Sequence, residues 1–495
     1  MARKLVTFDT GSLSRAERRM VKKVLEGKMR EAEQEAPVIE DTTVATWPEK
    51  LLAKIASGKL SMPPHVGTGW EFASASPFAA ADIPQIPGPV IGIEQLSGGV
   101  PFMFQPWNMY LEGVISSPNL LVKGSLRRGK SFIIKRLVTL LSLFGIYAIN
   151  TSDIKGEHGP VAEAIGGRCY KVGSFGSNVR LNPLEAHERH HGESIDEHRS
   201  RLLATRQNVL IQIANLLAEG DHPITAAEKT ILNWALDEVI RETNDHPTIR
   251  KVVEKINSEA LLSARDGRFT REMANRLIFL FDELLYGGLA GMFEDEGNVK
   301  FDPESPYTVF DTYAMEKRGD LALAITQTIT NSWVQATISN KGSGRRYAVI
   351  REEGWRDMKT KAALEAHELQ QKLSGEYGIM MIMIVHEDGD FDTGDSEMQH
   401  LAQKIMRGYA NQIVFAQDEA VLRNSVESGT LTRGEANLIS GFSRGEFLLK
   451  TAGRSYHIDG KPTATEWEKT LFDTDRQNRV REEEHLQSDE LREAA

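Results

Sequence analysis

The 495-residue chain contains the sequence Gly124-Ser125-Leu126-Arg127-Arg128-Gly129-Lys130-Ser131. It fits the pattern G-x-x-x-x-G-K-S, with an apolar strand candidate, Leu120 to Val122, before it and the start of a helix, Phe132 to Ile134, after it. Glycines at both ends let the backbone curl so that successive N–H groups point at one anion, and the following helix adds its positive N-terminal end. The motif and its context predict a P-loop, which holds the phosphates of a nucleoside triphosphate.

The residue types of this loop indicate its ligands. We expect nucleotide contacts along the whole stretch from Gly124 to Phe132. The Lys130 ammonium group is predicted to reach the β and γ phosphates and to act in catalysis, and the Ser131 hydroxyl is predicted to bind Mg²⁺. The sequence thus predicts ATP and Mg²⁺ as ligands.

A metal ion held by one serine needs a second anchor, usually an acidic residue at the end of another buried strand. The strand candidate Tyr347 to Ile350 is followed by Arg351 and then by two adjacent carboxylates, Glu352 and Glu353. We predict that Glu352 holds the water shell of Mg²⁺ and that Glu353 polarises the attacking water. The alternative is that the two acids begin an exposed helix, because the helix dipole favours acids there.

Strand and helix patterns alternate on both sides of a helical region, which predicts an α/β fold with a mostly parallel sheet. Short apolar pieces between Val90 and Ser117 indicate hairpin strands. The expected core elements are a helix at Lys130 to Phe144 and strands at Asn119–Lys123, Gly145–Asn150, 308–311, 347–350, 379–385 and 412–415. Between them, three-and-four apolar spacing predicts an all-helical insertion whose helices include Leu202–Ala218, Ala226–Glu242 and Met273–Leu285.

These patterns divide the chain into six predicted regions. The ATPase core is expected in two parts, 89–184 and 301–472, separated by the helical insertion at 185–300. Residues 1–36 are predicted to be a basic helical arm, since the first thirty carry nine Lys or Arg against three acids. A proline-containing linker at 37–88 and an acidic tail at 473–495 complete the list. The arm is either a solvated charged helix or a docking element for nucleic acid, lipid headgroups or an acidic partner.

Composition limits the class of function and the compartment. The formal net charge is −11, so any contact with DNA must come from a local basic patch. The single cysteine, Cys169, fits a reducing compartment. The most apolar long run, Leu137 to Ile149, is shorter than the roughly 20 residues that span a bilayer. We therefore expect a cytoplasmic protein without a transmembrane segment, which works at a membrane through partners.

The sequence His187-Glu188-Arg189-His190-His191 formally matches the zinc-protease pattern H-E-x-x-H. That chemistry needs both histidines on one face of a buried helix, with a third ligand. Here the segment is polar and is followed by Gly192. We predict a solvated turn before the helical insertion, and no zinc.

Several segments together resemble the VirB/TraC-type ATPases of conjugative and type IV secretion systems, within the HerA–FtsK branch of P-loop motors. The resemblance covers residues 90–470 and depends on the order and spacing of short motifs. They are Gly129-Lys130-Ser131-Phe132 with Lys135, Asp153-Ile154-Lys155-Gly156-Glu157-His158, Gly166-Gly167, Leu181-Asn182-Pro183-Leu184, Glu352-Glu353-Gly354-Trp355, Leu431-Thr432 with Glu435, and Gly445-Glu446-Phe447-Leu448-Leu449-Lys450.

The chain departs from the family pattern at several positions. Glu352 stands where the family has aspartate, and Arg351 stands where an apolar residue is usual. His386-Glu387 replaces a Thr-Gln sensor, and about 90 residues of arm and linker replace a large N-terminal domain. These changes put the rate of hydrolysis and the docking of partners in question.

The resemblance implies a RecA-like core, a hexamer, and ATP-driven transfer of DNA or protein at the inner face of the membrane. Its partners would be further copies of the chain, membrane-embedded channel components and possibly DNA. It also implies an arginine that contacts the neighbouring subunit's γ-phosphate, for which Arg407 and Arg444 are the candidates. Two alternatives remain: a soluble HerA–FtsK-type translocase of double-stranded DNA, and an ATP-bound assembly scaffold that hydrolyses little.

Overall fold

The computed structural model separates the chain into Met1–Pro77 and Phe78–Ala495, and all residues described here belong to the second unit. They are residues 83, 84, 86–173, 179–218, 222–263, 269–299, 302, 304–338, 344–352, 364, 367, 368, 370–372, 374–385 and 396–473. The predicted arm at 1–36, nearly all of the 37–88 linker, and residues 474–495 of the predicted tail lie outside this set.

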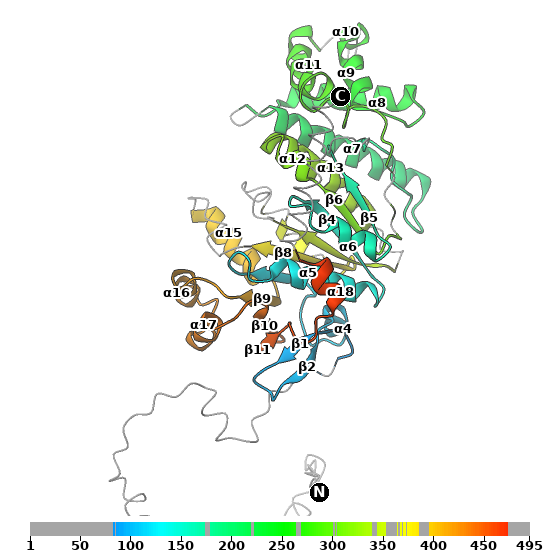
Figure 1. Cartoon of the computed structure of the whole chain (residues 1–495). Coiled ribbons are helices and arrows are strands. Elements are labelled where there is room, and N and C mark those ends of the chain that lie inside the picture. The colour runs from blue at the N-terminus through cyan, green and yellow to red at the C-terminus, as the bar shows by residue number, and fades with distance from the viewer. Residues whose placement is uncertain are drawn as a thin grey trace, which may run out of the picture. The chain divides into compact units, whose positions relative to one another are not determined.

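An eleven-stranded sheet forms the centre of the second unit, in the order β2-β1-β11-β10-β9-β3-β8-β7-β4-β6-β5 (Figure 1). Its strands are β1 (Val90–Glu94), β2 (Val100–Met103), β3 (Leu120–Lys123), β4 (Ile146–Asp153), β5 (Arg168–Lys171), β6 (Tyr307–Asp311), β7 (Arg346–Arg351), β8 (Ile379–Val385), β9 (Asn411–Phe415), β10 (Glu446–Thr451) and β11 (Arg454–Asp459).

The strands from β9 to β5 run parallel to one another, which confirms the prediction of an α/β fold with a mostly parallel sheet. β3 is central, because it pairs with β8 on one side and with β9 on the other. Every residue of β3, β6 and β8 is buried, as expected for parallel strands covered on both faces. The four remaining strands form an antiparallel extension that joins the parallel part where β10 pairs with β9.

Two hydrophobic cores lie on opposite faces of the sheet. Successive side chains of a strand point to opposite faces, and Leu121 accordingly joins one core while Leu120 and Val122 join the other. The second core includes α5 (Lys130–Ser142), the helix that follows the P-loop, and α6 (Gly159–Ala164). The first core includes α13 (Asp320–Ile338) and α15 (Ser396–Arg407).

In the described part of residues 185–300, the regular elements are all helices. It contains α7 (Ile195–Leu217), α8 (Ala226–Glu242), α9 (Ile249–Asn257), α10 (Ala260–Ser263) and α11 (Arg271–Leu285). Capping boxes start two of these helices, because Ser194 and Glu197 satisfy the first turn of α7 and Thr225 and Glu228 that of α8. In Figure 1 these helices gather beyond the β4-β6-β5 end of the sheet, and α13 packs between α7 and β4.

The hairpin strands predicted between Val90 and Ser117 are present, and a helix that had not been predicted comes after them. β1 and β2 form a hairpin, but α4 (Pro106–Leu111) follows it. Pro106 occupies the first turn of this helix, where a missing N–H costs nothing, and the Gln105 side chain caps it by accepting a bond from the N–H of Asn108. Other elements that had not been expected are α6, α13, α15, α12 (Tyr313–Glu316), α16 (Glu419–Glu427), α17 (Arg433–Ser440), α18 (Glu466–Leu471), β5, β10 and β11.

Candidate nucleotide-binding site

The P-loop connects the carboxyl end of β3 to the first turn of α5. Gly124 and Gly129 have φ values of +152° and +114°, and Arg127 has a φ of +60°. A Cβ at Gly124 would lie 2.6 Å from the Phe415 Cβ, so the loop can pass β9 only with glycine there. Ser125 ties the loop to the end of β9, because its N–H donates to the Ala416 carbonyl at 3.1 Å.

Lys130 is the first residue of α5, and its side chain folds back over the loop. The ammonium group donates to the carbonyl oxygens of Gly124 at 2.5 Å and Ser125 at 3.0 Å. The side chain is 8% exposed and lines a pocket at the mouth of the loop. A buried ammonium group in this position attracts an anion more strongly than a fully hydrated one would.

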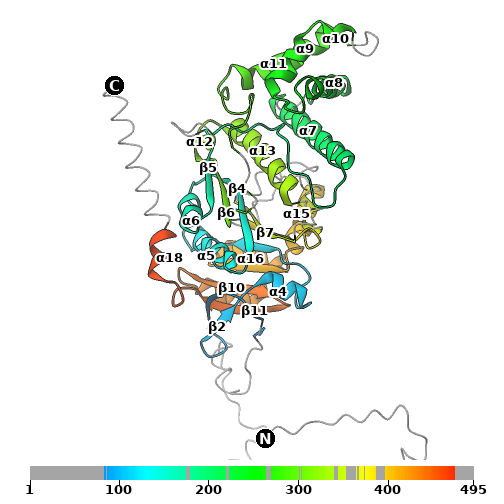
Figure 2. The ribbon, with the colours of Figure 1, turned by 90° about the vertical axis from the view of Figure 1, so that its right-hand side faces the viewer.

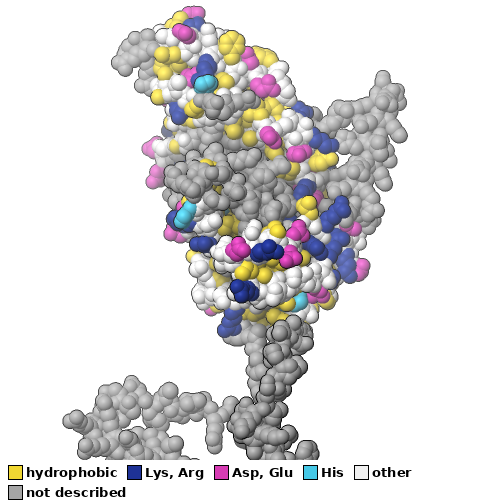
Figure 3. Space-filling model, turned by 90° about the vertical axis from the view of Figure 1, so that its left-hand side faces the viewer, with side chains coloured by type: hydrophobic (Ala, Val, Ile, Leu, Met, Phe, Trp, Pro, Cys, Tyr) yellow, Lys and Arg dark blue, Asp and Glu magenta, His cyan; other side chains and the backbone are white. Residues whose placement is uncertain are grey.

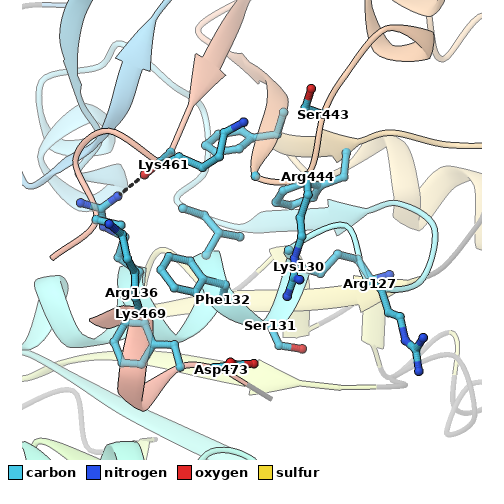
Figure 4. A pocket seen from close by; sticks show the side chains of 18 of the residues that line it. Arg127, Lys130, Ser131, Phe132, Arg136, Ser443, Arg444, Lys461, Lys469 and Asp473 are labelled. Carbon is cyan, nitrogen blue, oxygen red and sulfur yellow. Dashed lines mark hydrogen bonds between the residues drawn. The ribbon is translucent and has the colours of Figure 1, made fainter. Parts of the chain in front are cut away.

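This pocket has a volume of about 690 Å³. Seven cationic side chains line it, against two acids: Arg127, Lys130, Arg136, Lys155, Arg444, Lys461 and Lys469 against Glu157 and Asp473. In Figure 4, Arg444 extends toward Lys130 and Ser131, whereas Arg127 points away from them. An excess of positive charge at a P-loop mouth suits a polyphosphate ligand.

Aromatic side chains also line the pocket. They include Phe132, Phe447 and Phe472, and the Phe132 and Phe472 rings meet edge-on with centroids 5.4 Å apart. The pocket therefore offers apolar surface as well as positive charge.

The wall opposite the P-loop comes from the last part of the described chain. Gly445, which precedes β10, donates its N–H to the Arg128 carbonyl at 3.1 Å, and Gly460, which follows β11, donates to the Gly445 carbonyl at 3.1 Å. Arg136 of α5 donates to the carbonyl oxygens of Gly460 at 3.0 Å and Thr463 at 2.5 Å. The β10–β11 region and α18 are thereby fastened to the P-loop helix (Figure 2).

A group of buried charges lies at the carboxyl edge of the parallel strands. Asp153 ends β4, Asp311 ends β6, and Glu352 directly follows β7. The His158 ring contacts Glu352, with 2.7 Å between Nε2 and Oε1. Lys135 of α5 pairs with Glu157 at 3.3 Å, so this group is linked to the P-loop helix.

Burial and neighbouring charges shift the pKa values in this group. The pKa of Asp153 is raised to about 6, chiefly by burial and also by the Glu352 and Asp311 carboxylates, while the nearby His158 acts to lower it. Burial alone would lower the pKa of His158 and raise that of Glu352. Their mutual attraction outweighs burial, so the pKa of His158 is raised and that of Glu352 is lowered. The two side chains form an ion pair inside the protein.

The residues present are compatible with Mg²⁺. Glu352 Oε1 is engaged by His158, but Oε2 is buried and has no hydrogen-bond partner among the residues the structure describes. Such an atom needs a partner, and a hydrated cation supplies one. Ser131 lines the pocket with a hydroxyl that is also a suitable ligand.

The structure brings most of the predicted site residues together. Leu126, Arg127, Gly129, Lys130, Ser131, Phe132 and Arg444 line one pocket, and Gly124, Ser125 and Arg128 complete the loop beside it. Glu352 does not line this pocket but is close enough for the Lys155 charge to lower its pKa. Glu353 and the His386-Glu387 pair lie outside the described residues.

The two candidate arginines occupy different positions. Arg444 lines the pocket of its own chain. Arg407 is the exposed last residue of α15 and precedes β9, which places it at the amino edge of the parallel strands, opposite the P-loop. Of these two arginines, Arg444 is the one placed to meet a ligand in the pocket of its own chain.

The His187–His191 segment forms no helix, and α7 begins only at Ile195. Burial, together with the Arg201 charge, lowers the pKa of His187 to about 4. His190 Nε2 contacts the Ala336 carbonyl at 3.0 Å. In the described part of the chain, no three His, Cys, Asp or Glu side chains are grouped to hold a metal ion.

Neither a family model nor a curated protein matches the sequence. Among solved structures, VirB4 of Thermoanaerobacter pseudethanolicus is similar with a TM-score of 0.64 and 21% identity, and the match covers 79% of this chain and 100% of that one. The chain has the fold of VirB4. The plasmid coupling protein TrwB, in complex with the ATP analogue ADPNP, matches with a TM-score of 0.46 and 13% identity over 81% of this chain and 96% of that one. This second likeness adds nothing to the fold assignment.

The described surface carries both positive and negative side chains. On the face drawn in Figure 3, described Lys and Arg side chains lie interspersed with Asp and Glu. Among the described residues, no helix combines the length and the apolar character needed to cross a membrane.

Proposed function

We propose that the chain binds Mg–ATP in this pocket and hydrolyses it as a motor for DNA or protein transfer through a conjugative or type IV secretion-like apparatus. The observation that carries the proposal is the position of Lys130, buried in a P-loop that borders a pocket of about 690 Å³ with seven cationic side chains in its lining. The likeness to the VirB4 fold supports it, and so do the sequence motifs across residues 90–470.

In this proposal the P-loop side of the pocket holds the triphosphate. Backbone N–H groups of the P-loop and the Lys130 ammonium bind the phosphate oxygens, and Arg444 adds a further positive charge from the opposite wall. Ser131 and Glu352 would hold Mg²⁺, and the ion would neutralise part of the negative charge on the phosphates. Glu353 is proposed to orient and polarise the attacking water.

The nucleoside is proposed to pack against the phenylalanines that line the pocket. Aromatic faces bury a purine ring without requiring specific hydrogen bonds. Phe472 offers the most direct test of this contact, because it lines the pocket from the position after α18 and contacts both Phe132 and Trp467.

The motor is proposed to be a hexamer at the cytoplasmic face of the membrane, in contact with channel components. Arg407 is the proposed trans-acting arginine, because it cannot serve its own P-loop from the opposite edge of the sheet. We further propose that the two parts of the core, 89–184 and 301–472, hydrolyse ATP and thereby move residues 185–300 against a partner or substrate.

One observation favours a second candidate, the ATP-bound scaffold. Glu352 stands where the family has aspartate, and His158 engages its Oε1, so only Oε2 remains to hold the water shell of a metal. A scaffold of this kind would bind nucleotide and assemble, but would turn over little.

Steady-state ATP hydrolysis tests these candidates, using the wild type, Lys130→Ala and Glu353→Gln, each with and without double-stranded DNA. The motor proposal expects turnover that both substitutions abolish. Strong stimulation by DNA, with a steep salt dependence, would favour the translocase alternative. Tight nucleotide binding with turnover no faster than that of the two variants would replace the motor with the scaffold.

A further inference from the structure

A chain of three buried side chains ends at the proposed metal anchor. The hydroxyl of Tyr307 in β6 lies 2.6 Å from His158 Nδ1, and His158 Nε2 lies 2.7 Å from Glu352 Oε1. Tyr307 and His158 are fully buried, and Glu352 is 6% exposed. The residues come from three segments far apart in the sequence, so the arrangement is a product of the fold.

The bonding pattern fixes which oxygen of Glu352 is engaged. When the Tyr307 hydroxyl donates to Nδ1, the neutral imidazole carries its hydrogen on Nε2 and donates it to the Glu352 carboxylate. In the protonated ring, Nε2 also donates to Glu352, and Nδ1 donates to Tyr307. In both states Oε1 is occupied, and only Oε2 remains to face a ligand.

His158 is itself held rigidly. Its backbone N–H donates to Asp153 Oδ2 at 2.7 Å, and the N–H of Glu157 donates to Asp153 Oδ1 at 3.0 Å. The Glu157 carboxylate pairs with Lys135 of α5. The loop from Asp153 to His158 therefore connects the P-loop helix to the ring that orients Glu352.

We infer that His158 is a positioning residue, which fixes the Glu352 carboxylate so that Oε2 faces the hydrated Mg²⁺ of the bound nucleotide. The inference rests on the proposed function, because it takes Glu352 as the metal anchor. A glutamate has three side-chain torsions, and a buried partner that holds one oxygen removes most of that freedom. Partners of this kind typically change metal affinity or activity by about 10- to 100-fold when they are removed.

The test separates the two contacts of the ring. His158→Gln can place an amide donor near the position of Nε2, whereas His158→Asn places it near Nδ1 and cannot reach Glu352. His158→Phe removes both contacts and keeps the ring. The primary measurement is the affinity for a fluorescent ATP analogue, titrated with Mg²⁺ and also in excess EDTA, with thermal unfolding of each variant in EDTA as a check on folding.

We expect the Phe and Asn variants to need about 10- to 100-fold more Mg²⁺ for half-maximal tightening of nucleotide binding, with unchanged affinity in EDTA. The Gln variant should return to within a few-fold of the wild type. Wild-type Mg²⁺ dependence in all three variants would overturn the inference. So would an equal loss of affinity with and without Mg²⁺, or equal behaviour of the Gln and Asn variants, because each indicates a purely structural role.

This readout does not require turnover. A wild type that binds nucleotide in a Mg²⁺-dependent manner but does not hydrolyse it would refute the motor and leave the test of His158 intact. A wild type whose nucleotide affinity is insensitive to Mg²⁺ would overturn the inference directly.

Discussion

Replacing Glu468 by leucine should destabilise the protein and weaken nucleotide binding together. Glu468 in α18 is 5% exposed and pairs with Arg136 Nε at 3.1 Å, while its other oxygen accepts bonds from the N–H and hydroxyl of Thr465. Arg136 is 3% exposed, so the substitution leaves a buried guanidinium without its counter-ion. Breaking a buried pair from one side typically costs about 3–5 kcal/mol.

Combining Glu468→Leu with Arg136→Leu measures the coupling free energy between the two side chains. Arg136→Leu also loses the bonds to the carbonyl oxygens of Ile91, Gly460 and Thr463, which hold the wall of the pocket against α5. When both partners are apolar, no uncompensated charge remains. The loss of unfolding free energy in the double variant should therefore be about 1–3 kcal/mol smaller than the sum of the losses in the two single variants. Glu468→Gln is the matched control, because it keeps the cap on α18 and removes only the charge.

The assay is urea unfolding of the four proteins and the control, with ATP-analogue affinity measured on each. We expect each single leucine variant to bind nucleotide at least about 10-fold more weakly, the equivalent of 1.4 kcal/mol. Strictly additive stabilities, or a Glu468→Leu cost below about 1 kcal/mol, would refute the account of how the wall is held.

Three further predictions follow from individual contacts. Gly124→Ala places a methyl group 2.6 Å from Phe415 Cβ, so unfolding free energy should fall by about 1–3 kcal/mol and nucleotide binding should be lost, whereas Gly98→Ala, at an open turn, should keep binding. Burial lowers the pKa of His367 to about 3, against about 6.5 in the unfolded chain, so the free energy of unfolding should decrease as the pH falls below 6.5. In urea titrations, the wild type should lose about 2 kcal/mol of unfolding free energy between pH 7 and pH 5 relative to His367→Gln. Parallel pH curves for the two proteins would contradict this. Phe472→Ala should weaken binding of ATP but not of inorganic triphosphate, and an equal loss for both would exclude a nucleoside contact.

The sequence was sufficient for the elements whose signals are local. The P-loop carries its glycines, its lysine and its strand–helix context within about 15 consecutive residues, and the runs that became β3, β6, β7 and β8 are continuous apolar segments. The helices of the insertion were predictable because their apolar residues recur at helical spacing. The helix at Pro106–Leu111 was missed although its proline is typical of a first turn, because neighbouring strand patterns outweighed that signal.

The parts of the site that depend on distant segments could not be predicted. The wall formed by Gly445, Gly460 and α18 contains one of the short motifs, Gly445 to Lys450, but nothing in that motif indicates its position in space. Only the backbone bond to Arg128 and the contacts of Arg136 place the wall against the P-loop. The contact between His158 and Glu352 joins residues that are 194 positions apart. The acidic residue was predicted from its place after a strand, but its partner became visible only in the folded chain.

The central claim is that this pocket binds Mg–ATP through Lys130, and equilibrium calorimetry with Mg–ATP tests it most directly. Lys130→Ala removes a charge-assisted phosphate contact and should weaken binding by about 10- to 100-fold. Lys229→Ala, at an exposed position of α8, should bind as the wild type does. Wild-type affinity in Lys130→Ala, or no binding of Mg–ATP by the wild type, would contradict the account.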